Sequence, residues 1–336
     1  MDTLKVELKN YKELMQEYIK TKDEQSLYQA EQFSKQSMQQ NISPEEIINV
    51  HIEALQDLYP NMPEYIQSSL SFLLETMISY GMAYQEYQSL RERQLELKSE
   101  ISVAANMQKT LLSTVKPERK DLDIGAISIP AKQMNGDYHH FVEDVDGTLG
   151  IAIADVIGKG VPAALCMSMI KYSMDSFPEM RMDPDVILGS LNRVVERNVD
   201  SSMFITMFYG LYDPDNHTFN YSSAGHEPGY YYSKEKDEFE EINPSGLVLG
   251  VSSETTYHKF TREIAIGDMI ILLTDGVTEC RQGDRFIEQE EILEVIREYA
   301  HLPAQQTVEH VYKHFERLQD FQLRDDFTLV ILRRNV

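Results

Sequence analysis

The apolar run LGIAIADV at residues 149–156 places the carboxylate of Asp155 at a strand end, directly before a Gly-Lys-Gly turn. A carboxylate beside a buried strand is costly unless it is paired, hydrogen-bonded or bound to a metal ion. Asp155 could cap the next helix, because Val161 and Pro162 fit a first helical turn. The turn could also cradle a phosphate, although it lacks the nucleotide spacing G-x-x-x-x-G-K-S/T. The positions of the other acidic residues help to distinguish helix capping, phosphate binding and metal binding.

Further aspartates stand at or beside the ends of apolar runs. Asp137 lies in MNGDYHHF, Asp275 in LLTDGVTE, and Asp325 with Asp326 in LRDDFTL. Taken singly, Asp275 could belong to an Asp-Gly hairpin turn and the 325–326 pair to a solvated strand entry. If the strand ends meet, the carboxylates repel one another and require cations. Oxygen-only ligands suit Mg²⁺ and Mn²⁺, so the pattern predicts that Asp155 belongs to a metal site.

Composition limits the class of protein. A chain of 336 residues is long enough for about two domains. Its 31 Lys and Arg against 55 Asp and Glu give a net charge of -24, which argues against nucleic acid and anionic membranes as partners. Two cysteines, Cys166 and Cys280, cannot build a disulfide framework. No apolar run approaches a membrane span and the N-terminus lacks a signal-peptide core, so we expect a cytoplasmic protein.

Residues 1–82 are predicted to form an all-helical domain, since they hold almost no glycine and no strand-like alternation. One helix begins with a capping box, in which Ser43 is the N-cap, Pro44 the first helical residue and Glu46 the reciprocal partner. A wide apolar stripe over residues 63–84 is compatible with ordinary core and with a dimer or partner surface. This domain is expected to regulate the rest of the chain.

Residues 83–116 are predicted to form a linker helix with a heptad pattern. Two glutamines and an alanine would make the coiled coil weak, and a solvated helix lying on its own domain is the alternative. The two core positions of the heptad are taken by Tyr87, Leu90, Gln94, Leu97, Ile101, Ala104, Gln108 and Leu111.

From Leu122 onward the chain becomes rich in strand-like runs joined by short turns, which favours antiparallel sheets with helices packed outside. Helices are predicted over residues 161–177, 183–199, 288–300 and 303–319. Strands are predicted over residues 122–130, 148–156, 203–213, 217–225, 228–233, 268–275 and 326–334.

Several motifs occur in an order that resembles the PPM (PP2C-like) serine/threonine phosphatases of the SpoIIE type. They include NGDYHHF, IADVIGKGVPAAL, MFITMFYG, SAGHEPGYYY, GDMIILLTDGVTE and DDFTLVIL, and the resemblance covers about residues 122–334. It implies an α+β fold in which two packed antiparallel sheets are flanked by helices, an αββα sandwich. The phosphatase domain is therefore expected over residues 117–336.

The resemblance implies two Mn²⁺ or Mg²⁺ ions held between the sheet ends. Asp155 would lie between both ions, Asp137 and the Val156 carbonyl would hold one, and Asp275 and Asp325 would hold the other. Two ions lower the pKa of a bridging water and neutralise the phosphoryl group during an in-line displacement. Asp155 and Asp275 would then be catalytic through metal-activated water, without a covalent nucleophile.

The resemblance ranks Asp326 below Asp325, because relatives often have another polar residue at the second position. The turn of Gly158, Lys159 and Gly160 is expected to shape the substrate site, mainly through its backbone.

Two departures from the family pattern lie near Asp137. Asn135 stands where many relatives have a second glycine, and His140 stands where they have a further aspartate. The resemblance therefore does not extend to a third metal position.

The helical N-terminal region resembles the regulatory region of phosphatases of the bacterial general stress response. This implies a phosphorylated anti-anti-sigma protein (RsbV-like) as substrate and a switch-kinase protein (RsbT-like) as activator on the N-terminal domain. The phosphatase, as a homodimer, would then turn on a general stress sigma factor.

Two other classes of function stay open on the residues. The fold could be a catalytically silent scaffold, which the intact set of aspartates argues against. The chain could instead accept a phosphoryl group on His51 or on an aspartate. Acid-labile phosphate taken up from a kinase would favour the phosphoryl acceptor, whereas metal-dependent phosphate release would favour the phosphatase.

Overall fold

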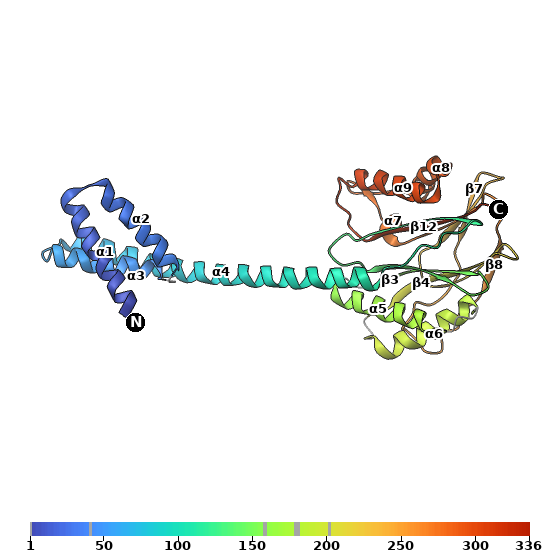
Figure 1. The fold of residues 1–336 in the computed structure, drawn as a ribbon, viewed down its shortest axis with the longest axis horizontal. Helices are drawn as coiled ribbons and strands as arrows, with labels where there is room; N and C mark the ends of the chain where they lie inside the picture. Colours follow the sequence, from blue (N-terminus) through green and yellow to red (C-terminus); the bar gives the residue numbers. More distant parts are fainter. Residues whose placement is uncertain (1, 40–41, 157–159, 178–181, 201–202) are drawn as a thin grey trace. The chain divides into compact units, whose positions relative to one another are not determined.

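The computed structural model describes residues 2–39, 42–156, 160–177, 182–200 and 203–336 (Figure 1). The chain forms two compact units, Met1–Lys98 and Ser99–Val336. Each unit has its own buried residues, as expected for a chain of this length.

The first unit is helical throughout, as predicted. The capping box is present, with the Ser43 backbone N–H donating to Oε2 of Glu46 at 3.3 Å. Met15, Phe33 and Ala54 are buried in its small core. The helices are α1 (Asp2–Thr21), α2 (Glu24–Gln39), α3 (Pro44–Leu58) and the first part of α4 (Glu64–Leu111).

Helix α4 has 48 residues and runs without a break through residues 82 and 83, where the sequence analysis separates the regulatory region from the linker. The side chains of its heptad pattern differ in environment. Leu90 and Leu97 are 57% and 58% exposed, whereas Gln108 is 6% exposed and packs within the second unit. The coiled coil stays a prediction, and Gln108 already has partners within its own unit.

The second unit contains two five-stranded sheets in which every pairing between neighbouring strands is antiparallel. One sheet has the order β1-β12-β9-β6-β7 and the other β2-β3-β4-β5-β8. Their strands are β1 (Leu122–Ile129), β2 (Asp137–Glu143), β3 (Leu149–Val156), β4 (Ile205–Asp213), β5 (Thr218–Ala224), β6 (Gly229–Ser233), β7 (Glu238–Ile242), β8 (Phe260–Glu263), β9 (Met269–Leu273) and β12 (Phe327–Arg334).

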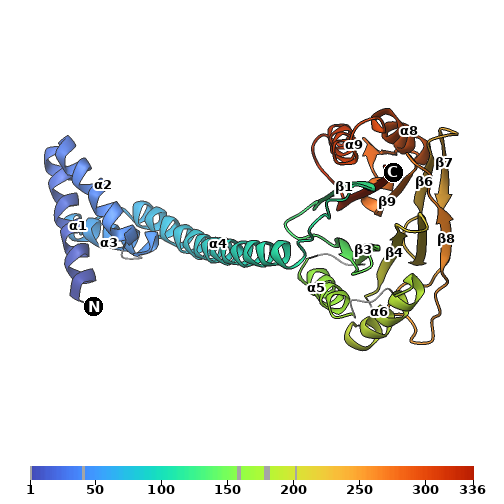
Figure 2. The ribbon, with the colours of Figure 1, turned by 45° about the vertical axis from the view of Figure 1, so that its right-hand side comes forward.

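The two sheets pack face to face and helices cover their outer faces (Figures 1 and 2). Ile151, Phe208 and Leu272 are buried between the sheets. Helices α5 (Val161–Asp175) and α6 (Pro184–Asn198) pack on the sheet of β2 to β5, while α8 (Gln289–Tyr299) and α9 (Ala304–Leu318) pack on the sheet of β9 and β12. The predicted αββα sandwich is therefore confirmed.

Each of the seven predicted strands of this region is present, but five strands were not predicted, namely β2, which begins with Asp137, and β7, β8, β10 (Arg281–Gln282) and β11 (Arg285–Phe286). Strands β7 (EFEEI) and β8 (FTRE) are short and mostly exposed, so their charged residues hide the alternation that marks a half-buried strand. The two-residue strands β10 and β11 form a separate hairpin. The Asp-Gly pair at 275 begins the single helical turn α7 (Asp275–Thr278), which excludes the hairpin-turn alternative there.

A helix that spans a bilayer must be both long and apolar. No helix in the described part of the chain meets both conditions.

Candidate metal centre

Two of the aspartates face each other across a pair of neighbouring strands. Asp137 begins β2, Asp155 is the penultimate residue of β3, and the register makes them direct cross-strand partners. Side chains of directly opposed residues lie on the same face of a sheet, and like charges there are destabilising. Pairing of β2 with β3 thus creates a local need for positive charge.

The second sheet brings two more carboxylates to its strand ends. Asp275 follows β9 and Asp325 precedes β12, and these two strands are paired. A Cβ atom on Gly276 would lie 1.9 Å from the backbone carbonyl oxygen of Asp326, so only glycine permits this approach. The close contact holds the start of α7 against the segment that carries Asp325.

The pKa values show that the carboxylates of the two sheets influence one another. Burial, and after it the charges of Asp275, Asp325 and Asp326, together raise the pKa of Asp155 to about 7. Burial and the charge of Asp325 raise the pKa of Asp275 to about 6. Burial also raises the pKa of Asp137 well above its usual range. These carboxylates are thus close enough for their charges to act on one another, and their role as metal ligands stays a prediction.

The donor set fits hard divalent cations. Within the described part of the chain, no three or more His, Cys, Asp or Glu side chains enclose a single ion position. Mg²⁺ is usually bound through one or two carboxylates with water completing its octahedron, so paired carboxylates are compatible with it. The donors at these strand ends are oxygen atoms, which favours Mg²⁺ or Mn²⁺ over softer metals.

Asp326 has a different environment from its neighbour. Its Oδ1 accepts the backbone N–H of Ala131 at 2.7 Å and its Oδ2 accepts the backbone N–H of Gly136 at 2.5 Å. Both carboxylate oxygens thus hold the loop that leads into Asp137. This contact supports a role for Asp326 in shaping the loop.

The Gly-Lys-Gly turn is described only at its last residue. Gly158 and Lys159 lie outside the described residues. Gly160 has φ +81°, a left-handed backbone that favours glycine, and it is the N-cap of α5. Because Gly160 takes the cap position, Asp155 does not cap this helix.

Hydroxyl and amide groups that the sequence analysis did not select surround Asp137. The Thr274 hydroxyl donates to Oδ2 of Asp137 at 2.6 Å, and the Asp137 backbone N–H donates to Oδ1 of Asn135 at 3.0 Å. Thr328 also lowers the pKa of Asp137 through a side-chain hydrogen bond, against the larger effect of burial. A threonine directly before Asp275 is the one sequence signal that could have pointed to this network.

His226, which lies in the motif SAGHEPGYYY, and His51 each have a hydrogen-bond partner at Nδ1. His226 is buried, its Nδ1 lies 2.9 Å from the Thr206 hydroxyl, and burial lowers its pKa to about 4, so the ring is neutral near pH 7. Nδ1 of His51, in the helical unit, is hydrogen-bonded to the Tyr11 hydroxyl at 2.9 Å. The contact with Tyr11 occupies Nδ1 of His51, one of the two ring nitrogens that could accept a phosphoryl group.

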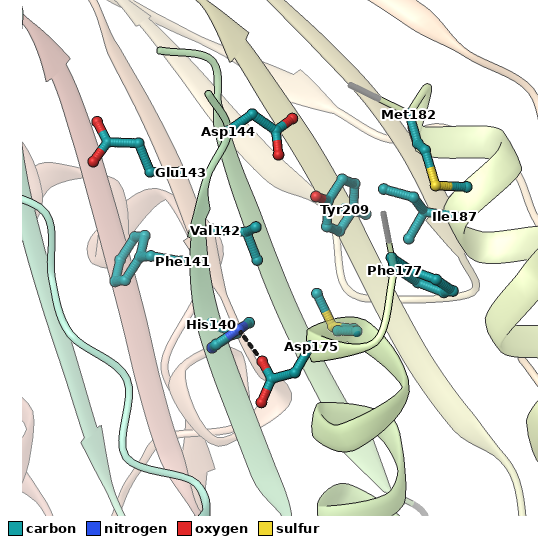
Figure 3. Close-up of a pocket in the computed structure, with 11 residues that line it drawn as sticks. His140, Phe141, Val142, Glu143, Asp144, Asp175, Phe177, Met182, Ile187 and Tyr209 are labelled. Carbon is teal, nitrogen blue, oxygen red and sulfur yellow. Dashed lines mark ion pairs between the residues drawn. The ribbon is translucent and has the colours of Figure 1, made fainter. Parts of the chain in front are cut away.

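A cavity of about 450 Å³ over the middle of β2 lies apart from the carboxylates (Figure 3). In it, His140 points toward Asp175, and Nε2 and Oδ1 are 3.3 Å apart. Met174, Phe177 and Ile187 form its apolar wall. None of the aspartates of the strand-end cluster lines this cavity, so we do not assign the chemistry to it.

Comparison with known proteins identifies the family. Residues 145–335 match the family described as Stage II sporulation protein E (SpoIIE). The phosphoserine phosphatase RsbU of Bacillus subtilis (strain 168) is 54% identical over 336 residues, the full length of both chains. The chain belongs to the SpoIIE family of PP2C-type phosphatases. Residues 9–83 in addition match the family described as the N-terminal domain of the phosphoserine phosphatase RsbU.

Solved structures of SpoIIE-family and other PP2C domains share the fold. The SiaA-PP2C domain of Pseudomonas aeruginosa has a TM-score of 0.62 and 20% sequence identity, covering 73% of this chain and 98% of that structure. The PP2C domain of SpoIIE from Bacillus subtilis, with a fragment of its regulatory domain, has a TM-score of 0.55 and 16% identity, covering 81% and 99%. These structures show the shared fold, and the family match with the full-length similarity to a phosphoserine phosphatase shows that the chain is a phosphatase of the PP2C class, a family of metal-dependent enzymes.

Substitution of a cluster aspartate should separate catalysis from stability. We expect Asp155→Asn or Asp275→Asn to lower kcat on the order of 1000-fold, because a metal contributes several kcal/mol to charge stabilisation and each 1.4 kcal/mol is tenfold in rate. The melting temperature in EDTA should stay the same or rise, since one repelling charge is removed.

The matched control for these variants is Asp213→Asn. Asp213 is also a buried aspartate at a strand end, since it is the last residue of β4. Its carboxylate accepts hydrogen bonds from the backbone N–H of Asp215 and from the side-chain amide of Asn216. This variant should lose stability and keep its kcat. Phosphate release at saturating Mn²⁺ and calorimetric melting measure both effects, and near-normal turnover in Asp155→Asn would show that the site is misplaced.

The pKa values predict how metal stabilisation depends on pH. Between about pH 4 and 7 Asp155 and Asp275 bind more protons in the folded metal-free protein than in the unfolded chain, because their pKa values are raised. Their contribution to the free energy of unfolding therefore falls as pH rises through this window. Mg²⁺ replaces these protons, so the rise in melting temperature on adding Mg²⁺ should be larger at pH 8 than at pH 5.

Comparing melting with Mg²⁺ and with EDTA at each pH cancels contributions from groups remote from the site. The Asp275→Asn variant should show a smaller pH dependence of this difference. An Mg²⁺ effect that is equal at pH 5 and pH 8 would contradict the assignment of the cluster.

Proposed function

We propose that the protein is a protein serine phosphatase that requires two Mn²⁺ or Mg²⁺ ions and acts on a phosphorylated anti-anti-sigma protein (RsbV-like). The observation that carries this proposal is the cross-strand pair of Asp137 and Asp155, which shares its electrostatic environment with Asp275 and Asp325. The substrate class is supported by the full-length similarity to a phosphoserine phosphatase of the same family.

In this proposal the chain binds the ions and shapes their surroundings. Two bound divalent cations would lower the pKa of water and neutralise the phosphoryl oxygens. Asp137, Asp155, Asp275 and Asp325 would hold them, with the Val156 carbonyl as a further oxygen donor. The donor hydroxyl of Thr274 keeps one oxygen of Asp137 oriented. Preorganised ligands of this kind avoid reorganisation when charge develops.

A covalent cysteine mechanism has no support in the structure. Cys280 is buried, its thiol donates to the Gly276 carbonyl at 3.2 Å, and burial raises its pKa to about 12. Cys166 is also buried, and burial raises its pKa. The thiolate is the nucleophilic form, so both thiols are poor nucleophiles at neutral pH.

We further propose that the helical unit binds an RsbT-like activator and forms a homodimer, which turns on a general stress sigma factor. Residues 9–83 match a family of regulatory domains. Large apolar side chains along the first half of α4 are strongly exposed, including Tyr65 at 75% and Phe72 at 76%. Exposed apolar surface of this kind marks protein interaction sites.

The direct test measures phosphate release from the phosphorylated anti-anti-sigma protein, with and without Mn²⁺ and with and without the activator. The proposal expects release that requires the metal and increases with the activator. Release that is independent of metal, or stable acid-labile phosphate on the chain itself, would overturn it.

Deletion of residues 1–82 tests where regulation resides. The sheets and helices of the second unit bury their own core, so the truncated protein should fold and keep metal-dependent hydrolysis of p-nitrophenyl phosphate. Its activity should no longer increase with the activator. An activator response equal to that of the full-length chain would contradict the regulatory role of this region.

The coiled-coil prediction is tested by Gln94→Leu. Burying a poorly paired amide costs about 1 to 3 kcal/mol, so replacing Gln94 should tighten a dimer on the order of tenfold and raise activity without the activator. Gln85→Leu is the matched control, since residue 85 lies outside the predicted core positions and is exposed. Dimer affinity comes from analytical ultracentrifugation. Tighter dimers with unchanged basal activity would leave the linker as a passive tether.

A further inference from the structure

The last turn of α4 makes a specific polar contact with the loop before Asp137. Gln108 is 6% exposed, its Nε2 donates to the backbone carbonyl of Asn135 at 2.6 Å, and its Oε1 accepts the Asn135 backbone N–H at 3.0 Å. One carboxamide thus satisfies both backbone groups of a residue 27 positions away, which the donor and acceptor of a glutamine allow.

Asn135 connects Gln108 to Asp137, a proposed metal ligand, through its own hydrogen bonds. Its Oδ1 accepts the backbone N–H of Asp137 at 3.0 Å, and its Nδ2 donates to the Ser128 hydroxyl at 2.8 Å. Ser128 lies 2.9 Å from the Thr328 hydroxyl, whose side chain also hydrogen-bonds Asp137. The backbone and the carboxylate of Asp137 are therefore held by one connected network that begins at Gln108.

The loop before Asp137 is not closely packed on the side that faces α4. A cavity of about 460 Å³ lies there, lined by residues of α4 such as Ala105 and by Ile129, Asn135 and His139. On its other side the loop is held by Asp326, through the backbone N–H groups of Ala131 and Gly136. Gln108 reaches the loop beside this hollow, so loss of its amide cannot be replaced by closer packing without movement of the loop.

A second contact fixes the same segment of chain to β2. The Thr114 hydroxyl lies 3.1 Å from Nδ1 of His140 and accepts the backbone N–H of Phe141 at 3.2 Å. Residues 108 and 114 are thus bonded to the entrance and to the middle of the strand that Asp137 begins. The end of α4 belongs structurally to the metal-binding unit.

We propose that Gln108 is a positioning residue for Asp137: through Asn135 it sets the position of the loop that presents this carboxylate to the metal ions. The proposal rests on the proposed metal-dependent function and adds a residue that acts through another. Hydrogen-bond partners of metal ligands typically contribute 10- to 100-fold to metal affinity. Gln108 is one step further from the ion than such a partner, and we expect the lower part of this range.

The test compares Gln108→Met, which keeps the length of the side chain and removes both hydrogen bonds, with Gln108→Glu, which keeps an acceptor for the Asn135 N–H but loses the donor. Met107→Ala is the matched control, because Met107 is the neighbouring residue on α4 and is 61% exposed. All variants are made in the full-length chain.

Mn²⁺ affinity is measured by titration calorimetry, and backbone hydrogen exchange of residues 131–137 is measured in metal-free protein. We expect Gln108→Met to bind Mn²⁺ about tenfold more weakly, Gln108→Glu to be intermediate, and Met107→Ala to be unchanged. Exchange at Asn135 should be faster in Gln108→Met. With p-nitrophenyl phosphate, saturating Mn²⁺ should restore most of kcat, since the affinity and not the chemistry is affected.

Wild-type Mn²⁺ affinity in Gln108→Met would overturn the proposal, as would an equal loss in Met107→Ala. If Gln108→Met fails to fold, Gln108→Glu decides, and unchanged affinity in that variant overturns the proposal as well. Absence of Mn²⁺-dependent hydrolysis in the unaltered protein would contradict the proposed function. The calorimetric comparison of variants would still decide the role of Gln108.

Discussion

Electrostatic repulsion among the strand-end aspartates is the constraint on which the catalytic unit depends. Pairing of β2 with β3 sets Asp137 directly opposite Asp155, and pairing of β9 with β12 adds Asp275 and Asp325 from the other sheet. Burial, and after it the charges of neighbouring carboxylates, raise the pKa values of Asp137, Asp155 and Asp275. The apolar core between the two sheets must offset the cost of this arrangement, while divalent cations would remove it.

The residues of this region fall into two groups. One group would bind the metal ions, and the other hydrogen-bonds to those ligands or to the loop that carries them. Thr274 and Asn135 donate or accept hydrogen bonds that orient Asp137. Asp326 uses both of its oxygens on the loop backbone, whereas the neighbouring Asp325 is the one proposed to hold an ion. The difference arises because one lies beside the loop and the other beside α7. Such supporting contacts commonly matter nearly as much as the ligands themselves.

Two glutamines of helix α4 lie in different environments. Gln94 lies at an exposed position, where it is available to a partner helix, whereas Gln108 is buried against Asn135. The helix therefore ends as a structural part of the second unit, although its middle has the heptad pattern of a linker.

The sequence by itself predicted the helical first region and antiparallel sheets with helices packed outside, because apolar periodicity and turn residues are local patterns. The αββα sandwich came from the family resemblance, as did the metal roles of the strand-end aspartates, which stay a prediction. The register that opposes Asp137 to Asp155, the short helix at Asp275 and the partners of Asp326 were decided by tertiary structure. So was the burial of Gln108, which heptad spacing assigns to a coiled-coil seam. A hydrogen bond between residues 27 positions apart leaves no periodic trace in a sequence, because it depends on how separate elements pack.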